Sequence, residues 1–490
     1  MDSAADSGLR YNQCMDHPPK PEAESQSKPV TIASGRSQAE GIAKFAHNVT
    51  YENLTPERRE RLKISILDSL ACAISAIGAA PIKAYLAQAK EFGGSDARCT
   101  LIGGGKANVV YASAYNTAVI RYIDFMDSYF AVGGLCHPSD NVAAVLAVSE
   151  YADRSGKDFL IALAVAYQVE CALTAAAPFL ARGLDLTTPL TYSLGAGVSK
   201  ALGLNEAKTA AAIEICGASG VPLLVVRTTP ISQWKGLNSS QVALGCVHDV
   251  FLASRGVTGP KYVIEGPNGL AHVLGQAIWV DWDKQQLDCF NRLSLKSYNS
   301  AVPTESPIFC MLELRKAQPF DPAEVVGIEA DVFQYAYDFT GGGTFGPKTN
   351  IHTKEDADHS LPYLLAVAAL DGDVQLAQLD PKRIEKSDVQ ELLLKVEVRP
   401  DSRFTALYPD QLASRVTVRL KSGESFSHEV SDYPGSANRP FTWKEIEAKF
   451  DKLAAGHADE KLCQEIKRAV RSLENIQVKA LMRLLSKVNV

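Results

Sequence analysis

The spacing of apolar residues changes twice along this chain, and these changes limit the folds that it can adopt. From residue 38 to about 285, apolar side chains recur at three- and four-residue steps, as in Leu62, Ile66 and Leu70. This is the spacing of one buried helix face. Thr55-Pro56-Glu57 precedes that run and is a typical helix start, with an N-cap hydroxyl followed by proline and an acid. This first part is therefore predicted to be mainly helical.

A two-residue alternation replaces the helical spacing after about residue 290. The segments 327–333, 395–399, 415–420 and 425–430 alternate apolar with polar side chains, and a Lys-Ser-Gly-Glu turn joins the last two. Such alternation is typical of half-buried antiparallel strands. Helical spacing returns at 304–317 and 361–370 between the strands, and again from Thr442 to the C-terminus.

These patterns predict a mainly α protein with an inserted α+β domain. Residues 37–289 form the first part of a large helical domain, residues 290–432 a smaller lid domain with an antiparallel sheet, and residues 433–490 the C-terminal part of the helical domain. A ligand cleft is expected where the two domains meet. Residues 1–36 are polar and contain several acids, so we expect a disordered tail and neither a secretory signal nor a transit peptide.

Charge and composition exclude several kinds of partner. The net charge of −6 argues against nucleic acid and against an anionic membrane surface, since both need a basic face. The apolar stretch 159–180 is long enough to cross a membrane, but Gln168 and Glu170 lie within it, so a buried helix is the better interpretation. We expect a cytoplasmic protein, and a mitochondrial location stays open.

The ten cysteines are scattered and include no Cys-x-x-Cys pair. A structural zinc site or an iron–sulfur cluster would need clustered ligands, and disulfide frameworks belong to small secreted domains. We therefore expect reduced, buried thiols and no metal.

The segment 121–141 gathers the polar residues that most resemble a site. It contains Arg121, Asp124, Asp127, His137 and Asp140, interrupted by glycine and proline. Polar groups that converge on an irregular backbone beside buried helices usually indicate a binding or catalytic site.

This segment resembles the signature of the MmgE/PrpD family, an Asp-x-x-Asp followed by His-Pro-Ser-Asp-Asn. Four further stretches agree with that family in the same order along the chain: Ile66–Ala71, Trp234–Gly236, Leu295–Ser300 and Ala357–Tyr363. The resemblance covers roughly residues 38–485 and implies a helical domain with an α+β lid, a homodimer, and a reaction without metal or organic cofactor. It also implies a small tricarboxylate as substrate.

The resemblance further implies which residues carry the chemistry. The catalytic candidates are Asp124, His137, Lys235, Lys296 and Tyr335. Further residues expected at the substrate are Arg121, Asp127, Ser139, Asn141, Leu186, Tyr298 and Pro303. Dehydration of a citrate-like alcohol builds negative charge on groups that are already anionic, and lysines in a dry site offset that charge. A histidine can move the proton, and an aspartate can orient the histidine.

Two positions depart from the family pattern. A Gly-x-Asp-His stretch of the family here ends in Leu186, and a His-x-Gln here begins with Pro303. The substrate could carry an apolar chain, the reaction could be a decarboxylation, or catalysis could be lost. Our leading prediction is dehydration of a 2-alkylcitrate, 2-methylcitrate or a longer homologue. The alternatives are decarboxylation of a cis-aconitate-type acid and a non-catalytic binding protein.

Overall fold

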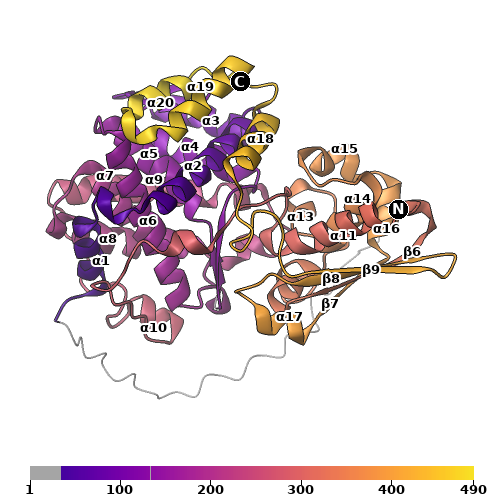
Figure 1. The fold of residues 1–490 in the computed structure, drawn as a ribbon. Coiled ribbons are helices and arrows are strands. Elements are labelled where there is room, and N and C mark those ends of the chain that lie inside the picture. The colour runs from indigo at the N-terminus through magenta and orange to yellow at the C-terminus, as the bar shows by residue number, and fades with distance from the viewer. Residues whose placement is uncertain (1–34, 133, 490) are drawn as a thin grey trace, which may run out of the picture.

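The computed structural model describes residues 35–132 and 134–489, and these residues form two parts that lie side by side (Figure 1). The predicted tail therefore falls almost entirely outside the described residues. One part is helical and contains both the beginning and the end of the described chain. The other, on the right in Figure 1, contains the sheet and is called the lid here.

Ten helices of the first part build the larger hydrophobic core. They are α1 (Gln38–Asn48), α2 (Pro56–Ala76), α3 (Ala80–Phe92), α4 (Val109–Tyr122), α5 (Val142–Tyr151), α6 (Gly156–Ala176), α7 (Thr188–Leu202), α8 (Glu206–Ser219), α9 (Asn238–Ser254) and α10 (Leu270–Leu274). The helix start predicted at Thr55 is confirmed, because its hydroxyl accepts a hydrogen bond from the backbone N–H of Arg58.

Helix α6 is the long apolar helix that the sequence analysis interpreted as part of the core. It passes a length and composition test for a membrane span, yet 78% of its most apolar window is buried inside the protein. Its neighbour α7 packs along it. The nine cysteines within the described residues are free thiols and buried.

Short strands complete the helical part. β1 (Cys99–Leu101) pairs with β2 (Gly105–Ala107), and β3 (Ser128–Ala131) pairs with both β4 (Gly134–Cys136) and β5 (Leu293–Ser294). The β3–β4 hairpin follows α4 and carries the signature segment into the space between the two parts. β5 leads the chain from the helical part towards the lid.

The lid is built on a four-stranded sheet in the order β7-β6-β8-β9. Its strands are β6 (Val325–Val332), β7 (Val396–Pro400), β8 (Ser414–Leu420) and β9 (Ser425–Val430). Its helices are α11 (Glu305–Ala317), α12 (Gln334–Ala336), α13 (Lys354–Ala357), α14 (Leu361–Asp371), α15 (Pro381–Ile384), α16 (Ser387–Leu393) and α17 (Ser402–Leu407).

The prediction of an antiparallel sheet is right for two pairs and wrong for the third. β8 pairs antiparallel with β6 and with β9, but β7 runs parallel to β6, with Ala330 opposite Val398. A parallel pair needs a long crossover connection. The helices α12–α16 supply it between β6 and β7.

After the lid, the chain returns to the helical part as α18 (Trp443–Ala454), α19 (Glu460–Arg471) and α20 (Val478–Leu485). α18 packs on α2, far away in sequence, and the three helices lie at the top of the helical part in Figure 1. Their buried side chains join the larger core, whereas those of α11, α14 and the sheet form a second core. The chain thus crosses between the two parts twice.

Candidate active site

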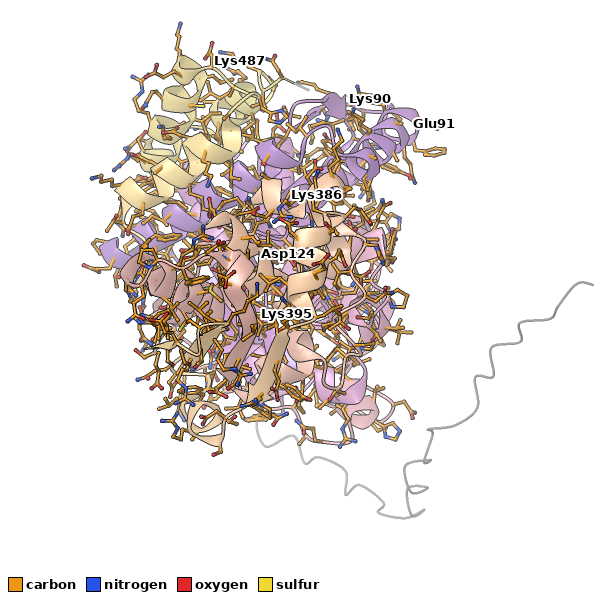
Figure 2. All side chains as sticks on the ribbon, turned by 90° about the vertical axis from the view of Figure 1, so that its right-hand side faces the viewer. Lys90, Glu91, Asp124, Lys386, Lys395 and Lys487 are labelled. Carbon is orange, nitrogen blue, oxygen red and sulfur yellow. The ribbon has the colours of Figure 1, made fainter. Side chains whose placement is uncertain are left out.

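Asp124 is the centre of a buried ion cluster at the junction of the two parts. Arg121 Nη1 lies 2.5 Å from Asp124 Oδ1, Lys296 Nζ 2.9 Å from the same oxygen, and Lys235 Nζ 2.9 Å from Oδ2. None of these four residues is more than 2% exposed. Figure 2, which views the molecule from the lid side, labels Asp124 near its middle. The cluster is therefore shielded from water. Charge interactions inside the protein are stronger than they would be in solvent.

Three separate backbone segments bring these cations to Asp124. Arg121 lies in the last turn of α4, three residues before Asp124, which itself adopts a positive φ of 57° just after the helix. Aspartate tolerates this left-handed conformation better than most residues. Lys235 lies in the short 3-10 turn Gln233–Gly236 ahead of α9. Lys296 follows β5 and also donates to the backbone carbonyl of Asp124 at 2.7 Å.

The lid contributes a second carboxylate and a histidine, which the sequence analysis did not name as site residues. Asp358 and His359 lie between α13 and α14. Lys235 Nζ is 3.1 Å from Asp358 Oδ1, and Lys354 Nζ is 2.8 Å from Asp358 Oδ2. His359 turns Nδ1 towards Asp358 and Nε2 towards Asp124 Oδ2, at 3.9 Å. Both residues belong to the stretch Ala357–Tyr363, whose resemblance to the family could have identified them.

The cluster carries more positive than negative charge. Arg121, Lys235, Lys296 and Lys354 supply four cations. Three carboxylates face them, those of Asp124 and Asp358 and that of Asp140, whose Oδ2 lies 3.8 Å from Arg121 Nε. Burial and the neighbouring Lys235 lower the pKa of His359 to about 3, so this histidine is neutral. The cations hold the pKa of Asp124 well below its usual range despite burial. A buried site with surplus positive charge is suited to an anion.

His137 lies on the helical side of this cluster, at the end of the β3–β4 hairpin. Its Nδ1 is 2.7 Å from the backbone carbonyl of Asp127 and 3.1 Å from Ser128 Oγ. A proton on Nδ1 can be donated to the carbonyl, which leaves Nε2 as the nitrogen that accepts a proton. Burial, together with Arg121 and Lys296, lowers the pKa of His137, so the ring is neutral at pH 7 and able to act as a base.

Asp127 holds the signature segment in shape. Its carboxylate accepts hydrogen bonds from Ser65 Oγ at 2.6 Å, from the Tyr167 hydroxyl at 3.0 Å and from the backbone N–H of Ser139 at 2.9 Å. Three protein donors therefore bind a carboxylate that is predicted to lie at the substrate. These bonds also fix the backbone of Asp127, whose carbonyl contacts His137 Nδ1.

The other polar residues of the segment divide into two groups. Asn141 donates to Glu170 at 2.5 Å and accepts from Ser193 at 2.9 Å, so its amide is used inside the protein. By contrast, Ser139 Oγ and Arg121 Nη2 are buried without a hydrogen-bond partner within the described residues, whereas Arg121 Nε faces Asp140 Oδ2 at 3.8 Å. Buried polar atoms are rarely left unpaired in proteins, and these atoms are suited to bind a ligand.

Tyr335 of the lid stands in a stack of aromatic rings next to His359. Its ring centroid is 5.6 Å from that of Phe339 and 6.0 Å from that of Tyr408, and Phe339 in turn meets the His359 ring edge-on at 5.3 Å. The Tyr335 hydroxyl is buried and has no partner within the described residues. Tyr408 ties this stack to the helical part by donating to the carbonyl of Ala131.

Leu186 and Pro303, the two departures from the family pattern, are both buried. Leu186 packs in the second core, which also contains Phe130 and Leu135 of the β3–β4 hairpin. Its neighbour Asp185 pairs with the buried Arg227 at 2.8 Å. Pro303 lies in the 3-10 turn Val302–Thr304. A buried apolar side chain thus stands at each position where the family pattern has a histidine.

Glu305 is a further buried carboxyl of the lid, two residues after Pro303. Its carboxyl accepts hydrogen bonds from the backbone N–H groups of Ser297 and Tyr298, at 2.8 and 3.2 Å, and from Ser300 Oγ at 3.0 Å. It therefore fixes the loop that follows Lys296 and contains Tyr298. Burial raises the pKa of Glu305 to about 8, against the opposing effect of Lys296.

Glu305→Gln is expected to flatten the pH dependence of stability between about pH 5 and pH 8. Because the folded-state pKa lies above the ordinary value of 4.5, the folded protein keeps a proton that the unfolded chain has released. That proton favours folding below the unfolded pKa, and the benefit is lost as the pH rises towards 8. Glutamine keeps an acceptor oxygen but does not titrate. Denaturant unfolding at both pH values would check this, and equal pH dependence in the two proteins would contradict it.

Asp124, Asp358 and His359 are also close enough to be considered as metal ligands, since one atom of each lies within 4.8 Å of the others. However, Lys235 Nζ bonds to both carboxylates and lies 3.3 Å from His359 Nδ1. A metal ion would have to displace that ammonium and would then face Lys296. This donor set fits a carboxylate cluster neutralised by lysines and does not fit a metal centre.

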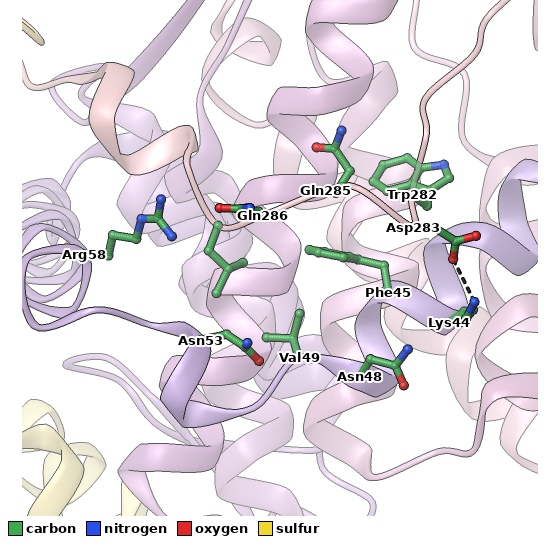
Figure 3. Close-up of a pocket in the computed structure, with 11 residues that line it drawn as sticks. Lys44, Phe45, Asn48, Val49, Asn53, Arg58, Trp282, Asp283, Gln285 and Gln286 are labelled. Carbon is green, nitrogen blue, oxygen red and sulfur yellow. Dashed lines mark hydrogen bonds and ion pairs between the residues drawn. The ribbon is translucent and has the colours of Figure 1, made fainter.

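A cavity of about 590 Å³ lies elsewhere, in the helical part (Figure 3). Phe45 and Trp282 form its apolar side, Lys44 bonds to Asp283 at its edge, and amide side chains fill much of the remaining wall. It contains no residue of the ion cluster. The cluster itself is almost inaccessible to solvent.

Comparison with known proteins agrees with this arrangement along most of the chain. Residues 40–280 match the MmgE/PrpD N-terminal domain, and residues 298–475 match the MmgE/PrpD C-terminal domain. An alkylcitrate dehydratase of Fungal sp. (strain ATCC 74256) is 25% identical over 87% of this chain and 90% of its own length. The human cis-aconitate decarboxylase is 25% identical over 90% and 93% of the two chains. The 2-methylcitrate dehydratase of Escherichia coli (strain K12) is 24% identical over 67% and 71%.

Proposed function

Since the chain belongs to the MmgE/PrpD family, we propose that it is a lyase that removes water from a 2-alkylcitrate. The observation that carries this proposal is the buried cluster around Asp124, in which four cations face three carboxylates. A tricarboxylate supplies the missing negative charge. Relatives named as dehydratases of alkylcitrate and 2-methylcitrate support this substrate class.

The geometry suits proton removal next to a carboxylate. His137 Nε2 takes the proton from the carbon, and the electron pair forms the new double bond as the carbon–oxygen bond of the tertiary alcohol breaks. The negative charge that builds on the adjacent carboxylate is stabilised by Lys235 and Lys296. The buried Tyr335 hydroxyl, which has no hydrogen-bond partner among residues 35–132 and 134–489, supplies a proton to the leaving hydroxide. Water and an alkyl-aconitate are the products.

A decarboxylase is the second candidate, because the human and mouse relatives are named as cis-aconitate decarboxylases. Loss of carbon dioxide also leaves negative charge next to a carboxylate, so the same lysines would stabilise it. A non-catalytic binding protein would have no use for buried lysines around Asp124 together with a neutral His137.

The test is incubation of the purified protein with 2-methylcitrate, a longer 2-alkylcitrate and cis-aconitate, in the presence of a metal chelator. Mass spectrometry of the products separates the two reactions, since one removes a water molecule and the other a carbon dioxide molecule. Dehydration of either alkylcitrate supports the proposal. Conversion of cis-aconitate alone would replace it by the decarboxylase.

We further expect the enzyme to prefer an alkyl chain longer than methyl. Leu186, which belongs to the same hydrophobic core as Phe130 and Leu135, places an apolar side chain where the family pattern has a histidine. Burial of each methylene against such a side chain contributes about 0.8 kcal/mol. A chain longer by two or three carbons should therefore raise kcat/KM by roughly tens-fold relative to 2-methylcitrate.

The matched variants are Leu186→His and Leu407→His, the second at an exposed leucine of the lid. Leu186→His should reduce the preference for the longer chain, whereas Leu407→His should leave it unchanged. If the wild type prefers 2-methylcitrate, or if Leu186→His keeps the ratio, the apolar wall does not select the substrate.

A further inference from the structure

Lys348 is a buried lysine of the lid that the proposed chemistry does not use. It is 2% exposed, and its Nζ lies 2.9 Å from Thr229 Oγ1, a neutral hydroxyl of the helical part. Within residues 35–132 and 134–489, no carboxylate oxygen lies within ion-pair distance of this ammonium. Lys235, Lys296 and Lys354 differ from it in this respect, since each reaches a carboxylate.

Backbone contacts place Lys348 beside the ion cluster. Its carbonyl accepts a hydrogen bond from Ser360 Oγ at 2.6 Å, and Ser360 directly follows His359. On the other side, the backbone N–H of Thr229 donates to the carbonyl of Phe345 at 3.4 Å, so the loop before Lys348 rests on the segment that leads to Lys235. Lys348 thus reaches from the lid across the junction of the two parts.

The loop before Lys348 is shaped to make this approach. Gly346 has a φ of +90°, a backbone conformation that residues with a side chain rarely adopt. A Cβ atom added at Gly346 would lie 3.5 Å from the Cβ atom of Thr229. The lid backbone and Thr229 therefore come close together with Lys348 between them. Burial lowers the pKa of Lys348 to about 8, with Asp356 and Asp358 opposing this effect and Lys235 adding to it.

A buried ammonium without a counter-ion is unfavourable unless something else satisfies it. The neutral hydroxyl of Thr229 provides one hydrogen bond but no charge. We propose that Lys348 binds a carboxylate of the substrate, namely one that does not take part in proton removal. This inference rests on the proposed function, because it needs a substrate with more carboxylates than Lys235 and Lys296 engage during the reaction.

A purely structural lysine makes a different prediction. If Lys348 only fastens the lid loop to Thr229, its loss weakens the closed lid for every ligand to the same degree. If it binds a carboxylate, its loss matters only for ligands that possess that carboxylate. The two roles are separated by changing the protein and the ligand together.

The experiment compares wild type, Lys348→Met and Lys386→Met, the last being the matched loss of an exposed lid lysine. Ligands are the 2-alkylcitrate that the wild type dehydrates and its three mono-amides, each with one carboxylate neutralised. Lys348→Met should raise KM for the parent by roughly thirtyfold and change kcat by less than about threefold. One mono-amide should bind wild type and Lys348→Met equally, and Lys386→Met should resemble wild type throughout.

Binding of citrate and its mono-amides, measured by calorimetry, repeats the comparison without turnover. If the wild type binds citrate but dehydrates no alkylcitrate, the proposed function is wrong. The binding of citrate and its mono-amides to wild type and Lys348→Met would then still decide whether Lys348 binds a carboxylate. Equal weakening of all four ligands by Lys348→Met, or no weakening, would overturn the role of Lys348, as would a wild type that does not bind citrate. If Lys348→Met does not fold, Lys348→Gln and Lys348→Arg take its place, and Lys348→Arg should retain the discrimination.

Discussion

Lys235→Ala is expected to lower kcat/KM by at least about a hundredfold, mainly through kcat. The Lys235 ammonium is the one cation that bonds to both Asp124 of the helical part and Asp358 of the lid, among the described residues. It therefore both stabilises developing negative charge and joins the two halves of the site. Loss of one preorganised donor of this kind typically lowers the rate by a factor of about a hundred to a thousand.

Steady-state kinetics with the alkylcitrate checks this prediction, with Lys386→Ala as the surface control. Lys354→Ala is a second comparison, since Lys354 bonds to Asp358 but not to Asp124. We expect Lys354→Ala to have a smaller effect on kcat than Lys235→Ala. Near-wild-type kinetics for Lys235→Ala would show that the ion cluster is only structural.

The class and order of the elements could be predicted because each depends on local pattern. The helical spacing around Leu62 marked α2, and the alternation around Val416 marked β8. Alternation shows which face of a strand is buried but not which strand lies beside it or in which direction. The parallel pairing of β6 with β7 therefore could not be read from the chain, because it depends on the path of five helices between them.

The candidate site was only partly predictable for a related reason. Arg121 and Asp124 are one helical turn apart, so their contact follows from local geometry. The approach of Lys296 and Lys235 to the same carboxylate was implied by the family resemblance, and no spacing in the sequence requires it. Asp358 and His359 come from the lid more than two hundred residues after Asp124. The family resemblance of Ala357–Tyr363 draws attention to them, but no local spacing predicts their contacts with Lys235 and Asp124.

Asp127 shows a different limit of prediction from sequence. A conspicuous acid in the signature segment was expected at the substrate, yet its carboxylate accepts three hydrogen bonds from protein groups. Sequence gives the residue type but not the side-chain partners, and a buried carboxylate needs such partners whether or not it contacts a ligand. The same argument applies to Asn141, whose amide bonds to Glu170 and Ser193.

Asp124→Asn is expected to remove activity and to destabilise the fold at the same time. The substitution keeps the shape of the side chain but takes away the negative charge that Arg121, Lys235 and Lys296 share. Breaking a buried ion pair from one side costs about 3–5 kcal/mol, because the remaining charges stay buried and uncompensated. Urea unfolding should therefore show a lower midpoint than in the wild type.

The matched control is Asp283→Asn. It removes an exposed carboxylate that also faces two cations, Arg36 and Lys44, and should change stability little.

The pH dependence of the same measurement gives a second check on Asp124. Its neighbours hold the pKa of Asp124 well below the ordinary value of 3.8, so the folded protein releases a proton that the unfolded chain still binds in acid. The resulting stability is present above the unfolded pKa and is lost as the pH falls towards the folded-state pKa. Below about pH 4 the wild type should therefore lose stability more steeply than Asp124→Asn, and the two midpoints should approach each other. Equal midpoints at neutral pH, or a constant difference down to low pH, would show that Asp124 does not carry the charge on which the cluster is built.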